Sequence, residues 1–123
     1  MCIRDSFPSI EIEPKEGFYD FKNKYTAGKT IYHLPPRVSP AAIAEMESLS
    51  LKIYEELRLR SVARVDFMVD KSNRVYFLEV NTLPGNTETS LVPQAAKEMG
   101  LSYPDFIDKI IERAQLDYDK ESL

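Results

Sequence analysis

Two short apolar runs separated by a turn constrain this chain more than any other feature of its sequence. The runs, Val62–Val69 and Val75–Val80, are rich in valine and aromatic residues, and the turn-forming stretch Asp70–Asn73 separates them. Residues of these types favour strands, and a polar turn between two such runs predicts a β-hairpin. The rest of the chain must therefore be arranged around an antiparallel strand pair.

Four polar residues on the predicted hairpin indicate a binding site. Arg64 and Asp66 stand two apart on the first strand, and Glu79 and Asn81 stand two apart at the end of the second. Because side chains alternate between the faces of a strand, each pair shares one face, and antiparallel pairing can gather all four. Carboxylate and amide oxygens suit Mg²⁺, and an arginine suits phosphate oxygens or a developing oxyanion. A solvated sheet face is the alternative explanation.

The composition limits the class of protein. With 123 residues, 43% of them hydrophobic, the chain has the size of one globular domain. A net charge of −4 without a basic block argues against nucleic acid or an anionic membrane as a partner. The single cysteine, Cys2, allows no disulfide within the chain, and no transmembrane-length apolar run or secretion signal is present. We therefore expect a cytoplasmic protein.

Apolar periodicity predicts the remaining elements. Phe7–Pro14 and Ile31–Leu34 have the patterns of short strands. Three helices are predicted at 39–59, 91–99 and 102–114, with apolar stripes that include Leu57 in the first and Ile111 in the last. These elements predict an α+β fold in which helices pack on one face of an antiparallel sheet.

Three motifs resemble a known family. They are RVDF at 64–67, FLEVNTLPG at 77–85 and TSLVP at 89–93. Together they resemble the C-terminal part of D-alanine–D-alanine ligases of the ATP-grasp superfamily, from about Pro8 to about Ala114. The resemblance implies the C-terminal part of an ATP-grasp fold and a parent enzyme, dimeric in many relatives, that acts on ATP and D-alanine. Such an enzyme joins two D-alanines through an acyl phosphate to give D-alanyl-D-alanine for peptidoglycan synthesis.

The resemblance also assigns roles on the hairpin and the turn that follows it. Asp66, Glu79 and Asn81 would bind Mg²⁺ or Mn²⁺, with two ions expected. Arg64 and the backbone N–H of Gly85 would act in catalysis by stabilising the transferring phosphoryl group and the oxyanion of the tetrahedral intermediate.

Further roles follow from the resemblance outside the hairpin. Lys24 would contact the nucleotide phosphates, and Tyr25 would close the catalytic site over the acceptor D-alanine. Ser90 and the N–H of Leu91 would bind the acceptor carboxylate at a helix N-terminus. On pattern alone, Lys24 would be a solvated lysine, Tyr25 a core aromatic and Ser90 a helix cap. Asn86 departs from the family, which usually has methionine there, and this affects the acceptor pocket.

The domain organisation is predicted from the same comparison of motifs. Residues 1–6 are expected to be a non-native leader or read-through junction, 7–116 the ATP-grasp C-terminal region and 117–123 a flexible tail. The sequence contains no glycine-rich phosphate loop, adenine pocket or donor-substrate domain, so we expect a fragment that is inactive alone. The alternatives are another ATP-grasp carboxylate–amine or D-lactate ligase, and a non-catalytic remnant that binds metal or nucleotide. Tyr25 argues against D-lactate.

Overall fold

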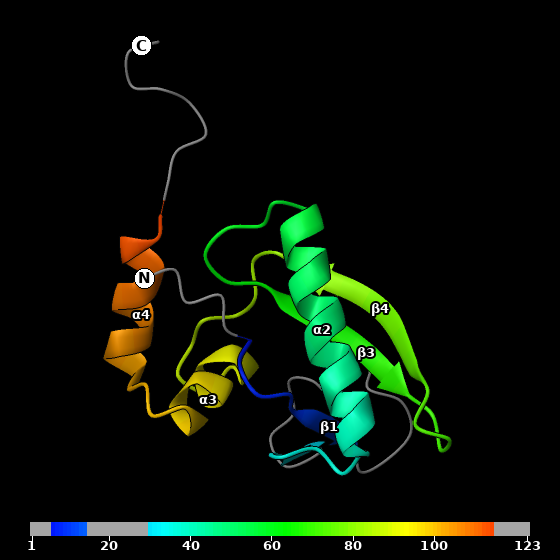
Figure 1. The fold of residues 1–123 in the computed structure, drawn as a ribbon. Helices are drawn as coiled ribbons and strands as arrows, with labels where there is room; N and C mark the ends of the chain where they lie inside the picture. The colour runs from blue at the N-terminus through cyan, green and yellow to red at the C-terminus, as the bar shows by residue number, and fades with distance from the viewer. Residues whose placement is uncertain (1–5, 15–29, 115–123) are drawn as a thin grey trace.

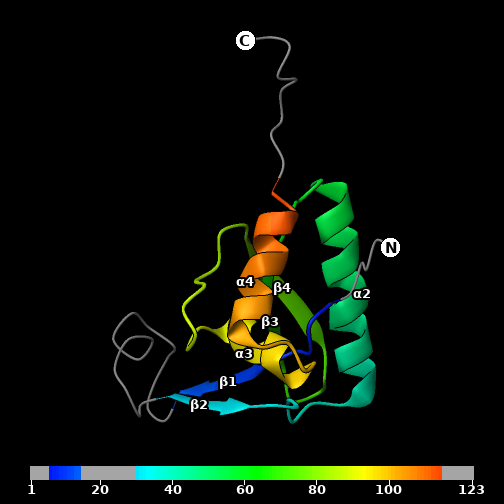
Figure 2. The ribbon, with the colours of Figure 1, turned by 90° about the vertical axis from the view of Figure 1, so that its left-hand side faces the viewer.

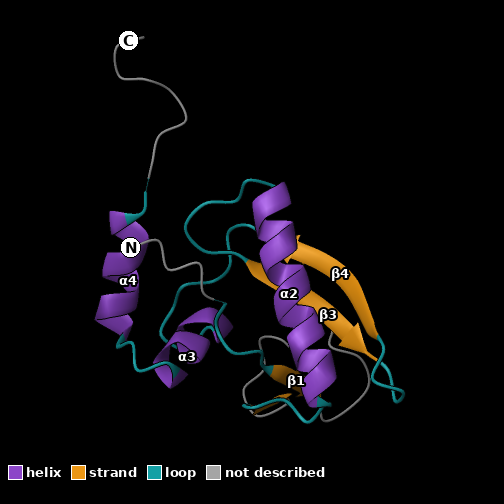
Figure 3. Ribbon diagram, viewed as in Figure 1, coloured by secondary structure: helices purple, strands orange, loops and turns teal. Residues whose placement is uncertain are grey.

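The computed structural model describes residues 6–14 and 30–114. Within them it places strands and helices in an α+β arrangement, which confirms the predicted fold class (Figures 1 and 3). The elements in chain order are β1 (Glu11–Pro14), β2 (Thr30–His33), α2 (Pro40–Glu56), β3 (Arg64–Val69), β4 (Val75–Asn81), α3 (Leu91–Glu98) and α4 (Tyr103–Glu112).

The strands form two antiparallel pairs instead of one sheet. β1 pairs with β2, and β3 pairs with β4 in the predicted hairpin. Helix α2 lies across the β3–β4 hairpin in Figure 1, and Figure 2 shows β1 and β2 side by side, level with the lower end of α2. Antiparallel pairing was predictable from the apolar runs, whereas the division into two sheets depends on packing between elements distant in sequence.

A β-bulge interrupts the β3–β4 hairpin. Asp66 pairs with Glu79, but the next pair is Phe67 with Phe77, so Leu78 is an extra residue on β4. The rings of Phe67 and Phe77 lie edge to face, with centroids 6.2 Å apart. The bulge therefore separates a polar end of the hairpin from an aromatic end near the turn.

Helix α2 begins where predicted and ends earlier. The Ser39 hydroxyl accepts a hydrogen bond from the Ala42 N–H at 3.2 Å, which satisfies one of the free donors of the first turn. Ala42 and Met46 are buried, as expected for the packing face. The helix ends at Glu56, and Leu57 is its C-cap with 55% of its surface exposed. The prediction that Leu57 continues the apolar stripe is wrong, because the helix has already ended there.

A second cluster of buried residues joins α3 to α4. Val92 and Ala96 of α3 pack with Phe106 of α4, and Phe7 lies edge to face on Phe106 with ring centroids 6.1 Å apart. Ile111, predicted to continue this packing face, is 65% exposed near the end of α4. In the part of the chain that the structure describes, no helix is both long and apolar enough to cross a membrane.

Arg37 connects the first strand pair to the segment before α2. Its guanidinium lies 2.7 Å from Glu11 and 2.7 Å from Glu13, and His33 of β2 contacts the same Glu13 carboxylate at 2.7 Å. The hydrogen bond that Glu11 accepts from Arg37 lowers the pKa of Glu11, and the hydrogen bond that Glu13 accepts from His33 lowers the pKa of Glu13. These contacts stabilise a two-stranded sheet, a structure that is marginal on its own.

We expect acid to weaken this part of the fold. Because the folded-state pKa values of Glu11 and Glu13 lie below the ordinary value of 4.5, their stabilisation is present above that value and is lost as the pH falls through the lowered values. Urea unfolding between pH 7 and pH 3 should show this loss in the wild type and a shallower loss in Arg37→Met. Arg74→Met, at an exposed arginine, is the control. An unchanged acid slope in Arg37→Met would contradict the assignment.

Candidate functional site

The β3–β4 register brings the four predicted polar residues of the hairpin together. Arg64 pairs directly with Asn81, and Asp66 pairs directly with Glu79. Directly opposed residues of antiparallel strands project to the same face, with Cβ atoms roughly 4.5–5.5 Å apart. The predicted arrangement of these four side chains is therefore confirmed by the pairing, while their roles stay predictions.

Arg64 and Asp66 form a two-pronged ion pair along β3. The Arg64 Nε donates to Asp66 Oδ1 at 2.7 Å, and Nη2 donates to Oδ2 at 3.0 Å. The two side chains are 19% and 29% exposed, so solvent screens the pair only partly. This geometry fixes the orientation of the carboxylate, and each of its oxygens keeps a further lone pair for another donor or a cation.

Asn81 and Glu79 complete the oxygen-rich face. Asn81 Oδ1 accepts a hydrogen bond from the Leu83 N–H at 3.0 Å, which orients the amide. Glu79 is exposed, and among the described residues no hydrogen bond engages its carboxylate. The same residues contain no group of three or more His, Cys, Asp or Glu side chains that could hold a metal. Two carboxylates and one amide fit Mg²⁺ or Mn²⁺ if phosphates and water supply the remaining ligands.

Gly85 lies directly against Ser90. A methyl group built at Gly85 would stand 3.0 Å from the Ser90 hydroxyl oxygen, closer than ordinary van der Waals contact. The preceding residue, Pro84, is buried and anchors this turn. The structure therefore places the predicted oxyanion donor next to the predicted carboxylate ligand, and a β-carbon at position 85 would press on the Ser90 hydroxyl.

Ser90 occupies the N-cap position of α3 without capping the helix through its side chain. Its backbone is extended, but its hydroxyl makes no capping hydrogen bond. The third helical residue is Pro93, which has no N–H, so a usual partner of a capping serine is missing. Among the described residues, no hydrogen bond occupies the N–H groups of Leu91 and Val92 at this end of α3. Ser90 is therefore an N-cap by position, as the alternative explanation expected, but its side chain makes no capping hydrogen bond.

The Ser90 hydroxyl is bound by Thr87 instead. It accepts a hydrogen bond from the Thr87 N–H at 3.2 Å and lies 2.7 Å from the Thr87 hydroxyl. Thr87 is absent from the site residues predicted from the sequence. The proline at the third position of the helix is the signal that could have identified it, because it releases the serine for another partner.

Asn86, the residue at which the sequence departs from the family pattern, lies between the turn at 82–85 and α4. Its backbone carbonyl accepts a hydrogen bond from the Tyr103 hydroxyl at 2.8 Å. Its side-chain Oδ1 is buried and has no hydrogen-bond partner among the described residues. A polar acceptor thus follows Gly85, where the family resemblance predicts an apolar methionine. Lys24 and Tyr25 lie outside the described residues, so their predicted roles stay predictions.

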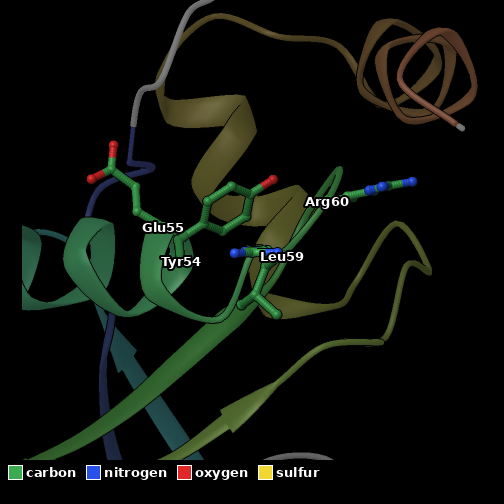
Figure 4. A pocket seen from close by; sticks show the side chains of 5 residues that line it. Tyr54, Glu55, Leu59 and Arg60 are labelled. Carbon is green, nitrogen blue, oxygen red and sulfur yellow. The ribbon is translucent and has the colours of Figure 1, made fainter. Parts of the chain in front are cut away.

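A hollow of about 460 Å³ lies at the end of α2 (Figure 4). None of the predicted site residues lines it. In the figure the Tyr54 ring lies beside Leu59, while Glu55 and Arg60 project in opposite directions. Its lining residues are Tyr54, Glu55, Arg58, Leu59 and Arg60.

The segment after this hollow contains a strained residue whose replacement should stabilise the fold. Ser61 has a φ of +57°, in the left-handed region that favours glycine, and its buried hydroxyl has no partner among the described residues. We expect Ser61→Gly to raise the free energy of unfolding by about 1 kcal/mol. Ser61→Ala is the control, because it removes the hydroxyl and keeps the strain. Urea unfolding measures both, and a less stable Ser61→Gly would contradict this account.

Comparison with known proteins identifies the class to which this fold and site belong. Residues 4–112 match the family model described as D-ala D-ala ligase C-terminus, and the chain therefore belongs to that family. It is 44% identical over 109 residues to a D-alanine–D-alanine ligase of Pelotomaculum thermopropionicum, covering 89% of this chain and 34% of the relative. The chain thus spans about a third of the length of the curated relatives that it matches.

Two solved structures extend the comparison. The Bacillus anthracis D-alanine–D-alanine ligase complexed with ATP is 37% identical, with a TM-score of 0.68 over 87% of this chain and 35% of its own. The VanG D-Ala:D-Ser ligase of Enterococcus faecalis is 35% identical, with a TM-score of 0.67 over 84% of this chain and 30% of its own. The described structure is the C-terminal part of an ATP-grasp fold.

Proposed function

We propose that this chain forms the metal- and acceptor-binding part of an ATP-dependent ligase that joins two D-alanines. The direct pairing of Arg64 with Asn81 and of Asp66 with Glu79 is the observation that carries the proposal. An arginine, two carboxylates and an amide thereby lie on one face, a set that can bind metal ions and phosphate oxygens. The family membership and the ATP complex of a neighbour support the same reaction.

The proposed reaction has two steps. The carboxylate of one D-alanine attacks the γ-phosphorus of ATP, which gives an acyl phosphate and ADP. The amine of the second D-alanine then attacks the acyl carbon, and phosphate leaves as the peptide bond forms. Mg²⁺ or Mn²⁺, with two ions expected, would be held by Asp66, Glu79 and Asn81 and would supply charge neutralisation at the phosphates.

The remaining residues bind and orient the substrates. Arg64 and the Gly85 N–H would donate to the oxyanion that develops when the amine attacks the acyl phosphate. The Ser90 hydroxyl and the Leu91 N–H would bind the carboxylate of the acceptor, because α3 presents donors and the positive end of its dipole there. Tyr25 would close the site over the acceptor. ATP as a substrate accords with the cytoplasmic location expected from the sequence, and a dimeric parent stays a prediction.

A ligase of the same chemistry with a different acceptor is the second candidate. Asn86 favours it, because its side-chain Oδ1 has no hydrogen-bond partner among the described residues and, once turned toward the site, could accept a hydrogen bond that an alanine side chain does not offer. The D-Ala:D-Ser specificity in the name of one neighbour shows that the fold accommodates another acceptor in that protein.

A fusion protein tests the function. Residues 7–114 would replace the corresponding C-terminal third of the Pelotomaculum thermopropionicum ligase, to which the chain is 44% identical. The fusion protein should release ADP and form D-alanyl-D-alanine, and competition among D-alanine, D-serine and D-lactate identifies the preferred acceptor. A folded fusion protein that forms no product would contradict catalysis and favour a binding role. The 123-residue chain alone should release no ADP.

A further inference from the structure

We propose that Thr87 is a positioning residue that directs the Ser90 hydroxyl proton toward the carboxylate of the acceptor substrate. This inference rests on the proposed function, since it assigns a residue to the acceptor site. Thr87 belongs to no motif on which the family resemblance rests, and its hydroxyl lies 2.7 Å from that of Ser90.

The hydrogen-bonding capacity of Ser90 carries the first step. A serine hydroxyl has one proton to donate and two lone pairs that accept. The Thr87 N–H, which can only donate, occupies one lone pair at 3.2 Å. The Thr87 hydroxyl lies within hydrogen-bond distance of the same oxygen and can occupy the second. When the Thr87 hydroxyl is the donor of this pair, both lone pairs of Ser90 are filled and the Ser90 proton is left for a third group.

The neighbouring Thr89 hydroxyl is compatible with this direction of donation, since either hydroxyl of the Thr87–Thr89 pair can be the donor. Thr89 Oγ1 lies 3.5 Å from Thr87 Oγ1, so donation from Thr89 to Thr87 leaves the Thr87 proton for Ser90. The three hydroxyls can then donate in sequence, from Thr89 to Thr87 to Ser90. A carboxylate bound to Ser90 stabilises this order of donation, because an ionised carboxylate accepts hydrogen bonds and cannot donate them.

The backbone of helix α3 cannot be the third group that accepts the Ser90 proton. The free backbone groups at a helix N-terminus are N–H donors, which cannot accept the serine proton. Pro93 lacks even an N–H at the position where a capping serine usually binds. On its other side, Gly85 leaves room beside the Ser90 oxygen that a methyl group would fill. A carboxylate there receives the Ser90 hydroxyl and the Leu91 N–H together.

Matched substitutions in the fusion protein test the inference. Thr87→Val keeps the shape and the backbone N–H but removes the hydroxyl, and should raise the KM for the acceptor D-alanine about tenfold. The turnover number and the KM for ATP should change less than about twofold, because the phosphoryl-transfer residues are untouched. Thr87→Ser restores the hydroxyl and should restore the acceptor KM. Thr82→Val makes the same chemical change at an exposed threonine and is the control.

The outcomes separate this inference from the proposed function. An active fusion protein in which Thr87→Val keeps the wild-type acceptor KM would overturn the role of Thr87 and leave the function intact. A fusion protein that forms no dipeptide would overturn the function. In that case, titration of the 123-residue chain with D-alanine, followed by the Leu91 and Val92 amide resonances, decides the role of Thr87. Weaker binding in Thr87→Val than in Thr87→Ser supports it, and equal or absent binding overturns it.

Discussion

Glu79→Gln in the fusion protein should lower the turnover number by at least about a hundredfold, while the KM for D-alanine changes less than about threefold. The substitution keeps the size of the side chain and removes its charge. Because Glu79 is exposed and no hydrogen bond among the described residues engages its carboxylate, the fold should be unaffected. The loss would therefore report on charge neutralisation at the phosphates and not on unfolding.

Steady-state kinetics at several Mn²⁺ concentrations measure this effect. The concentration of Mn²⁺ that gives half-maximal activity should rise in Glu79→Gln, because one anionic ligand is lost. Glu98→Gln, an exposed glutamate on α3, provides the matched control and should leave both constants unchanged. Near-normal turnover of Glu79→Gln at saturating metal would remove Glu79 from the proposed metal site.

Arg64→Lys should lower the turnover number by about a hundredfold to a thousandfold, the range seen when one oxyanion donor is removed. Lysine keeps the positive charge but lacks the planar fork that binds both oxygens of Asp66. The carboxylate would lose its fixed orientation, so the metal site and the oxyanion donor would both be impaired. Kinetics in the fusion protein measure the effect, and Arg74→Lys at an exposed position is the control.

Stability distinguishes the Arg64 substitution from the Glu79 substitution. Since the Arg64 and Asp66 side chains are mostly buried, Arg64→Lys should also lower the free energy of unfolding, by about 1–2 kcal/mol. Glu79→Gln should leave that free energy unchanged. Retained turnover in Arg64→Lys would show that a positive charge alone suffices, and would contradict the role of the guanidinium geometry.

The hairpin site was predictable because it depends on local rules. Strand alternation and antiparallel pairing are sufficient to place Arg64, Asp66, Glu79 and Asn81 on one face, and the register confirms that placement. The contact between Gly85 and Ser90 was beyond such rules, although both residues were predicted to belong to the site. Their approach depends on the path of the turn, which alternation and helical periodicity do not describe.

Other features depended on contacts that the sequence pattern does not encode. The Arg37 network joins residues separated by 24 and 26 positions, and charge alone did not distinguish Arg37 from the other surface arginines. Leu57 follows the helical spacing but lies where α2 has ended, since the chain enters the left-handed region at Arg58 with a φ of +50°. Thr87 was missed because serine at an N-cap usually binds its own helix.

Because β4 contains the extra residue Leu78, its odd-numbered positions do not all face the same side of the hairpin. In a regular strand, 75, 77, 79 and 81 would face the same side, mixing valine and phenylalanine with Glu79 and Asn81. The one-residue shift at Leu78 lets Phe77 meet Phe67 while Glu79 stays opposite Asp66. Leu78 thus places the apolar odd positions of β4 on one face of the hairpin and the odd positions that carry the predicted ligands on the other. Pairing Leu78 with Phe67 in a regular ladder would return Phe77 and Glu79 to the same face, whereas deleting Leu78 would make them neighbours and keep them on opposite faces.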